Sequence, residues 1–403
     1  MKNYIIAFCF IILIAVLACE EDKHKPITKD KQIPSAVLNP KVKNLPGGAL
    51  ITYDLPDEDD LLYVEAKYQL KNGTNLKVKA SVFGDTLEVT GFGDTDVYNV
   101  DLYTIDRSEN RSEPVQVQVQ PETPQVINVF ESLTLAPTFG GVNVKWENDL
   151  KDPMAIKILI PDTLNNNEGF IDLETIYTEA SKGDYNIRGF KIEEIPVYGV
   201  VRDRWNNYSD TIKVDILPLY EEEIDKSKFK EVILPNDTKQ VEPWNANGFS
   251  TIPKLWDGNS DSRLVGFNGE MPEYYYTFDM GTVAKLSRFK FWQFTQSSGK
   301  YLYFDAQYRK FKIYGAETLD ASGDIGSWTL LKECEIVKPS GLPDGLKNYT
   351  NEDKQIALEG HDFEIPLEAP AVRYIRVQVV ETASGLNWAS CGEMTFWGQP
   401  IAN

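Results

Sequence analysis

The stretch Gly47-Gly48-Ala49-Leu50-Ile51-Thr52-Tyr53-Asp54 returns 93 residues later as Gly140-Gly141-Val142-Asn143-Val144-Lys145-Trp146-Glu147. A second pair of matching segments, residues 106–113 and 203–210, is offset by 97 residues, and each copy runs into an alternating stretch and a proline. A repeat of about 95 residues is the size of a β-sandwich of roughly seven strands. The sequence therefore predicts two tandem sandwiches, at residues 34–121 and 122–219.

Alternation of apolar and polar residues supports this interpretation outside the repeated segments. Leu76-Lys77-Val78-Lys79-Ala80 and Val115-Gln116-Val117-Gln118-Val119 both alternate with period two. Half-buried strands have this period, because successive side chains point to opposite faces of a sheet. Turn sequences such as Asn72-Gly73 separate these stretches, and long helical periodicity is missing. The fold class predicted from the sequence is all-β.

The pattern Gly-Gly-x-x-apolar-x-aromatic resembles the early strand of fibronectin type III domains. That resemblance implies Ig/fibronectin III-like sandwiches, with Tyr53 and Trp146 packed between the sheets. The matching pairs Asp106-Arg107 and Asp203-Arg204 are expected to fix a loop between late strands, and not to act in catalysis.

Composition excludes several classes of function. The 403 residues carry 41 Lys and Arg against 61 Asp and Glu, a formal net charge of −20. Nucleic-acid binding is excluded, because affinity for phosphate backbones comes mostly from cationic side chains. The chain has two histidines, His24 and His361, which argues against histidine triads and multi-histidine metal sites.

The N-terminus has the features of an export signal. Lys2 precedes an apolar segment too short for a confident membrane span, and a small residue ends it. Val16-Leu17-Ala18-Cys19 resembles the lipobox of bacterial lipoproteins. The resemblance implies a signal peptide at residues 1–18, a lipidated Cys19 and a tether at residues 19–33. The acidic residues after Cys19 are similar to the surface-export signal of some Gram-negative lipoproteins, so we expect an outer-membrane protein facing the cell exterior, attached to the membrane by its lipid alone.

Two cysteines, Cys334 and Cys391, remain in the mature chain besides Cys19. The export signal predicts a compartment in which disulfides persist. A disulfide and two buried thiols are both compatible with the sequence.

The C-terminal part of the chain, after the repeats, differs from them in composition. Residues 220–403 hold 27 of the 47 aromatic residues and six of the eight tryptophans, which we interpret as the contact surface. Six motifs follow one another in the order of the discoidin, or coagulation factor type C, jelly roll, which includes the family-32 carbohydrate-binding modules. They begin at Leu255, Tyr274, Arg309, Trp328, Arg373 and Gly392. The resemblance covers residues 237–400 and implies a discoidin-like, galactose-binding-like β jelly roll at residues 230–403.

Members of this family often carry a structural calcium ion. The family's calcium motif matches Asp257 and Ser262 in an early loop and Glu393 near the C-terminus. Calcium takes six to eight oxygen ligands, and carboxylates, hydroxyls and carbonyls of an Asp-Gly-Asn turn supply such atoms. The resemblance therefore implies calcium as a structural cofactor, whereas the alternative is an ordinary turn beside a surface glutamate.

Sugar-binding members of the family hold their ligands on loops at one end of the barrel. A pyranose needs a flat aromatic ring for its C–H face, and amide, Arg or carboxylate groups for its hydroxyls. Nine aromatics fall within residues 291–314, and a second loop follows at residues 384–388. Phe291, Phe311 and Tyr314 are expected in the core. The ligand-binding candidates are Trp292, Gln293, Tyr301, Tyr303, Arg309, Asn387 and Trp388.

The whole arrangement resembles surface lipoproteins encoded with polysaccharide-uptake systems. The resemblance implies a non-catalytic protein that captures a glycan, with an outer-membrane transporter and its glycan-binding lipoprotein as partners. A protein-interaction subunit of such a complex, without sugar binding of its own, is the alternative. An enzyme is disfavoured, because no Gly-x-Ser-x-Gly elbow, P-loop or zinc motif occurs in the sequence.

Overall fold

The structure is a computed structural model that describes residues 30–162, 169–238, 251–261, 263–267 and 274–401. The predicted signal peptide and lipidated Cys19 lie outside these residues. Contacts divide the chain into two compact units, one formed by residues up to 135 with 144–184 and 196–214, the other by residues 136–143, 185–195 and 215 onward. Within the described ranges, no helix has the length and apolar character needed to cross a bilayer.

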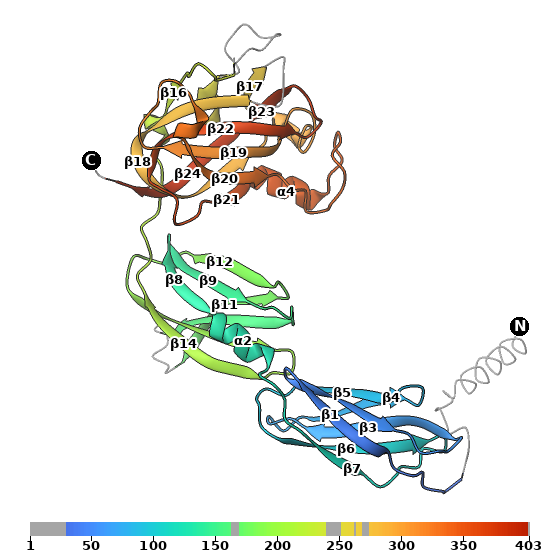
Figure 1. Cartoon of the computed structure of the whole chain (residues 1–403). Coiled ribbons are helices and arrows are strands. Elements are labelled where there is room, and N and C mark those ends of the chain that lie inside the picture. Colours follow the sequence, from blue (N-terminus) through green and yellow to red (C-terminus); the bar gives the residue numbers. More distant parts are fainter. Residues whose placement is uncertain (1–29, 163–168, 239–250, 262, 268–273, 402–403) are drawn as a thin grey trace, which may run out of the picture. The chain divides into compact units, whose positions relative to one another are not determined.

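Almost all regular structure is β-strand, as the sequence predicts (Figure 1). The first repeat forms a three-stranded sheet of order β1-β2-β5 and a four-stranded sheet of order β4-β3-β6-β7. The bounds are β1 Leu38–Leu45, β2 Gly48–Asp54, β3 Leu61–Gln69, β4 Asn75–Ser81, β5 Thr86–Thr90, β6 Tyr98–Asp106 and β7 Val115–Val119.

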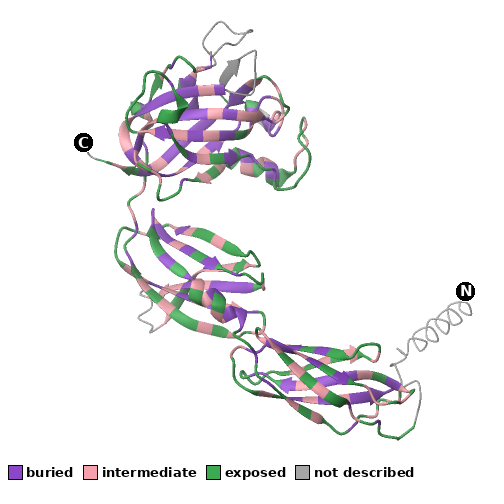
Figure 2. Ribbon diagram, viewed as in Figure 1, coloured by how far each residue is buried: buried purple, intermediate pink, exposed green. Residues whose placement is uncertain are grey.

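Strand β2, the stretch that opens the repeat, is half-buried with period two. Ala49, Ile51 and Tyr53 are buried, while Thr52 and Asp54 are exposed. Gly48 is required because a Cβ there would lie 2.6 Å from the carbonyl oxygen of Val89 on β5. Figure 2 shows the same alternation of buried and exposed residues along strands elsewhere in the chain.

The second repeat has sheets of order β12-β9-β8 and β11-β10-β13-β14. Its elements are α2 Gln125–Ser132, β8 Thr134–Thr138, β9 Gly141–Glu147, β10 Met154–Pro161, β11 Phe170–Thr178, β12 Lys182–Arg188, β13 Ile195–Asp203 and β14 Tyr208–Ile216. Trp146 on β9 is buried, as predicted, and its ring fills the space beside Gly183, where a Cβ would lie 2.0 Å from Cζ2.

The two Asp-Arg pairs build the same loop twice. Asp106 is fully buried, and its carboxylate accepts hydrogen bonds from the backbone N–H groups of Ser108 and Asn110, at 2.8 Å each, and from the Asn110 side-chain amide. Asp203 accepts the equivalent bonds from Trp205 and Asn207. The aspartates therefore hold the β6–β7 and β13–β14 connections, and the predicted structural role is confirmed.

The C-terminal module is a β-sandwich built around one long strand, β18 (Tyr274–Trp292), which pairs with four others. The main path runs β15-β24-β18-β22-β19-β20, β16 and β21 also pair with β18, and β17 pairs with β23. The strands are β15 Glu222–Glu223, β16 Lys230–Val232, β17 Leu264–Phe267, β19 Tyr308–Ala316, β20 Thr329–Glu335, β21 His361–Glu364, β22 Val372–Thr382, β23 Trp388–Cys391 and β24 Glu393–Pro400. The helical turns are η1 Lys226–Lys228, η2 Ile252–Leu255, α3 Gln296–Gly299, η3 Ile325–Ser327 and α4 Asn351–Glu359.

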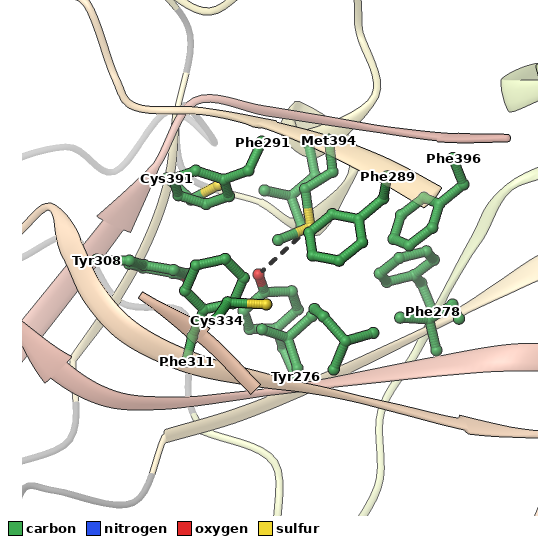
Figure 3. Packing of buried hydrophobic residues seen from close by; sticks show 14 of the residues in the cluster. Tyr276, Phe278, Phe289, Phe291, Tyr308, Phe311, Cys334, Cys391, Met394 and Phe396 are labelled. Carbon is green, nitrogen blue, oxygen red and sulfur yellow. Dashed lines mark hydrogen bonds between the residues drawn. The ribbon is translucent and has the colours of Figure 1, made fainter. Parts of the chain in front are cut away.

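Aromatic rings pack against one another in the core of this module, among aliphatic side chains (Figure 3). Phe289 stacks on Phe396, with centroids 5.4 Å apart, and Phe291 packs against Phe311 at 4.9 Å. Of the nine aromatics in residues 291–314, Phe291, Phe294, Tyr303, Tyr308 and Phe311 are buried. Phe291 and Phe311 are buried as predicted, whereas Tyr314, also expected in the core, is only half-buried. Phe294, Tyr303 and Tyr308 are buried as well, so our interpretation of the aromatic residues of 220–403 as contact surface was wrong for these three rings.

Cys334 and Cys391 are both free and buried in this core (Figure 3). Burial raises the pKa of each thiol, so both are held in the protonated, unreactive form. Of the two alternatives that the sequence left open, the structure contains the buried thiols.

The loop clamp yields a first prediction. Replacement of Asp106 by alanine leaves two half-buried backbone N–H groups without their acceptor, so we expect the first sandwich to lose about 1–3 kcal/mol of stability. Amide hydrogen exchange measured across residues 98–119 checks this, because exchange of β6 and β7 then becomes faster. Asp57→Ala, at an exposed position, is the control and should leave exchange unchanged; equal exchange in both variants would contradict the role of Asp106.

Candidate ligand-binding loops

Two loops of the C-terminal module, residues 300–307 and 383–388, are tied together although they lie far apart in the sequence. The Asp305 N–H donates to Ser384 Oγ at 2.9 Å, and the Ser384 N–H donates to the Asp305 carbonyl at 3.0 Å. Ala383 donates its N–H to the Gln307 carbonyl at 2.8 Å. The sequence predicted both loops as candidates, and the structure brings them to one place.

The backbone of these loops needs unusual conformations. Tyr303 and Asp305 have φ of 55° and 63°, in the left-handed region that few residues other than glycine and asparagine adopt. Gly385 has φ of 64° in the second loop. Such strain persists where surrounding contacts hold it, and the hydrogen bonds between the two loops supply those contacts.

Three predicted residues reach the surface of this loop pair. Asn387 is exposed, and Tyr301 and Trp388 are half-buried. The Lys300 ammonium lies 4.8 Å from the centre of the Tyr301 ring, a cation–π contact that keeps a positive charge beside the ring. We use the term loop face for Arg263, Lys300, Tyr301, Asp305, Asn387 and Trp388.

Charged residues of the loop face were missed by sequence reasoning. Arg263 stacks on the Phe294 ring, with its guanidinium carbon 4.7 Å from the centroid. Burial raises the pKa of Asp305, and the charge of Arg263 opposes this shift, so the two groups act on each other. Arg263 is 42 residues away from Asp305 in the sequence, and nothing in the spacing signals this proximity.

Gln293 and Tyr303 do not reach solvent. Gln293 is 1% exposed, and its side-chain oxygen accepts the Tyr303 N–H at 3.1 Å. Tyr303 is 2% exposed, and its hydroxyl donates to the Asp353 carbonyl on α4 at 2.9 Å. Through these buried hydrogen bonds, both residues hold the loop of residues 300–307 in position.

Trp292 and Arg309 make contacts away from the loop face. Trp292 donates its indole N–H to the Leu358 carbonyl at the end of α4, and its ring lies against Gly360. Arg309 forms ion pairs with Asp344 at 3.0 Å and Glu381 at 3.5 Å. Of the seven predicted ligand-binding residues, Tyr301, Asn387 and Trp388 are therefore the ones that reach the surface on the two loops.

The predicted calcium ligands lie elsewhere, at the start of β24. Ser262 lies outside the described residues. Glu393 is 4% exposed. Its carboxylate accepts one hydrogen bond from the Lys226 ammonium, at 2.5 Å, and one from the Gly258 N–H, at 3.1 Å. Burial is the largest influence on the pKa of Glu393 and raises it, with Lys226 and Gly258 opposing and Asp257 adding to the rise. Asp257 is paired with Lys254 at 3.0 Å.

These pairings do not fit a calcium ion held by the two carboxylates. Calcium binds oxygen lone pairs, whereas a protonated lysine offers none and repels a cation. Each carboxylate has an ammonium group in contact with it. In the part of the chain that the structure describes, no three His, Cys, Asp or Glu side chains are grouped so as to hold a metal.

Comparisons with known proteins place the chain in a family. Three family models match successive regions: a domain of unknown function (DUF4959) at residues 34–121, a second (DUF5126) at residues 122–227, and a third (DUF5000) at residues 256–398. A solved SusE-like protein is 31% identical, and the match covers 69% of this chain and 100% of that one, with a TM-score of 0.45. The chain belongs to the SusE-like proteins.

Two further solved structures match part of this SusE-like chain. The third family-32 carbohydrate-binding module of a family 31 glycoside hydrolase from Clostridium perfringens is 14% identical, with 44% of this chain and 95% of that one covered and a TM-score of 0.31. The C-terminal domain of a chitobiase from Bacteroides fragilis is 12% identical, with 45% and 100% covered and a TM-score of 0.31. Among curated proteins, none matches the chain significantly.

The contrast between buried and exposed candidates yields a second prediction. Gln293→Ala removes the acceptor of a buried N–H, so we expect the C-terminal module to lose about 1–3 kcal/mol of stability. Asn387→Ala, at an exposed position of the other loop, should change stability by less than about 0.5 kcal/mol. Tryptophan fluorescence during urea unfolding measures this, because six of the eight tryptophans lie within residues 220–403. Equal stability of the two variants would contradict the positioning role of Gln293.

Proposed function

We propose that the protein is a non-catalytic glycan-binding lipoprotein of the cell surface, which captures a polysaccharide or oligosaccharide on the loop face of its C-terminal module. The observation that carries this proposal is the identity of 31% with a SusE-like protein over the whole of that chain. The order of the six C-terminal motifs, which resembles that of family-32 carbohydrate-binding modules, adds independent support from the sequence.

The chemistry of the loop face is suited to a saccharide. Tyr301 and Trp388 present aromatic groups for the C–H face of a sugar ring, and Asn387, Asp305 and Arg263 offer donors and acceptors for its hydroxyl rim. The loops are fixed to each other by two backbone–backbone hydrogen bonds and by one from the Asp305 N–H to the Ser384 hydroxyl, so little conformational entropy is lost when they bind.

Affinity of a single loop face is expected to be modest, since few rings and few hydrogen bonds are involved. Many copies on one cell surface raise the effective affinity for a polymeric ligand. This fits attachment through a lipid at Cys19, which the lipobox-like sequence supports and which would hold the protein in the outer membrane, facing outward. In this proposal the partners are a glycan, an outer-membrane transporter and the transporter's own glycan-binding lipoprotein.

A glycan array of plant, microbial and host polysaccharides, probed with the purified protein, tests the proposal. We expect at least one polysaccharide to bind and to be recovered uncleaved. Trp388→Ala and Tyr301→Ala should each weaken binding of that polysaccharide about tenfold, as loss of one stacked ring does. Isothermal titration calorimetry measures the change.

Tyr177→Ala provides the matched control, because Tyr177 is a tyrosine that is 75% exposed in the second sandwich. The affinity of the Tyr177→Ala variant for the same polysaccharide should equal that of the unmodified protein. An array without any bound polysaccharide would overturn the proposal. Co-purification of an outer-membrane transporter in the absence of sugar binding would then favour the assembly role instead.

A further inference from the structure

Three segments that are distant in the sequence meet at Glu393. They are the turn at Trp256–Gly258, the short helix η1 and the first residue of β24. In the discoidin-like family, the predicted role of Glu393 is to share a calcium ion with the early turn, which would join these segments through the metal. In this chain they are joined without one.

The Lys226 ammonium makes this connection. It contacts Glu393 Oε1 at 2.5 Å, while Oε2 of the same carboxylate accepts the Gly258 N–H at 3.1 Å. The Lys226 side chain is 19% exposed and that of Glu393 is 6% exposed, so water screens the pair only weakly. The carboxylate thereby bridges η1 and the early turn.

A second lysine neutralises the other predicted calcium ligand. Lys254 contacts Asp257 Oδ2 at 3.0 Å, and the two side chains are partly exposed, at 32% and 26%. Asp257 and Glu393 carry two negative charges between them, and Lys226 and Lys254 carry two positive charges. The charge that one calcium ion would bring is therefore supplied by the chain itself.

The position of Lys226 is fixed on both sides. Upstream, Glu222 and Glu223 pair with β24, and the Ile224 N–H donates to the Phe396 carbonyl at 2.9 Å. Downstream, Phe229 packs against Trp256 and Phe278, with ring centroids 5.5 and 5.7 Å apart. Asp225 caps η1 by accepting the Ser227 N–H at 3.0 Å. The lysine is thus held beside Glu393 by the segment in which it lies.

We propose that Lys226 takes the place of the structural calcium ion of the discoidin-like fold. Its ammonium group then joins η1 to the start of β24, and the module folds independently of metal. A buried carboxylate that loses its partner is strongly destabilising, because its charge is then neither solvated nor paired. The lysine is therefore essential to the module, whereas calcium is dispensable.

Thermal unfolding of the whole protein, followed by tryptophan fluorescence with EDTA or with millimolar calcium chloride, tests this proposal. The unmodified protein should show the same melting temperature in both. Lys226→Met should lower the melting temperature of the module by roughly 5–15 °C in EDTA. Lys228→Met is the matched control, because Lys228 lies in the same helical turn with its side chain 57% exposed, and it should shift the temperature by less than about 2 °C.

The double variant Lys226→Met, Glu393→Gln keeps the test decisive if the single variant fails to fold. Removal of both charges leaves no unpaired carboxylate, so the double variant should be more stable than Lys226→Met alone. The proposal is overturned if EDTA lowers the melting temperature of the unmodified protein, if calorimetry detects calcium binding to it, or if Lys226→Met is as stable as Lys228→Met.

Discussion

Burial of alternate side chains along β18 is the constraint on which the rest of the C-terminal module depends. This strand pairs with β16, β21, β22 and β24, and it contributes Tyr274, Tyr276, Phe278, Phe289 and Phe291 to the core. A shift of one residue in its register would turn these rings toward solvent, so the register of all its partners is fixed with it. The turn before β24 and the loops at the ends of β19 and β22 take their positions from this sheet.

Aromatic residues in this module lie in two environments that composition does not separate. Rings on strands, such as Phe291 and Phe311, pack against each other inside the sandwich, whereas Tyr301 and Trp388 belong to the loop face. The same residue type is buried in the core in one place and partly exposed on the loop face in the other. What distinguishes them is burial, which depends on the opposite sheet.

Charges show a similar division between local and distant causes. Asp106 and Asp203 bind backbone groups two and four residues further along the chain, so the repeated sequence alone is enough to indicate their role. Lys226 and Glu393 are 167 residues apart, and their pairing depends on how η1 is held against β24. The match of Glu393 to a calcium motif was visible in the sequence, but the lysine facing it was not.

The sequence by itself determined the all-β class, the two repeats and the order of the C-terminal motifs, because strand alternation, turn residues and repeated spacing are local properties. It also located the two loops that the structure ties together. Only the tertiary structure decided that Gln293 and Tyr303 are buried supports, that Arg263 and Asp305 act on each other at the loop face, and that both cysteines are free. These outcomes depend on which segments pack together across long separations in the chain, and side-chain burial and charge pairing follow from that packing.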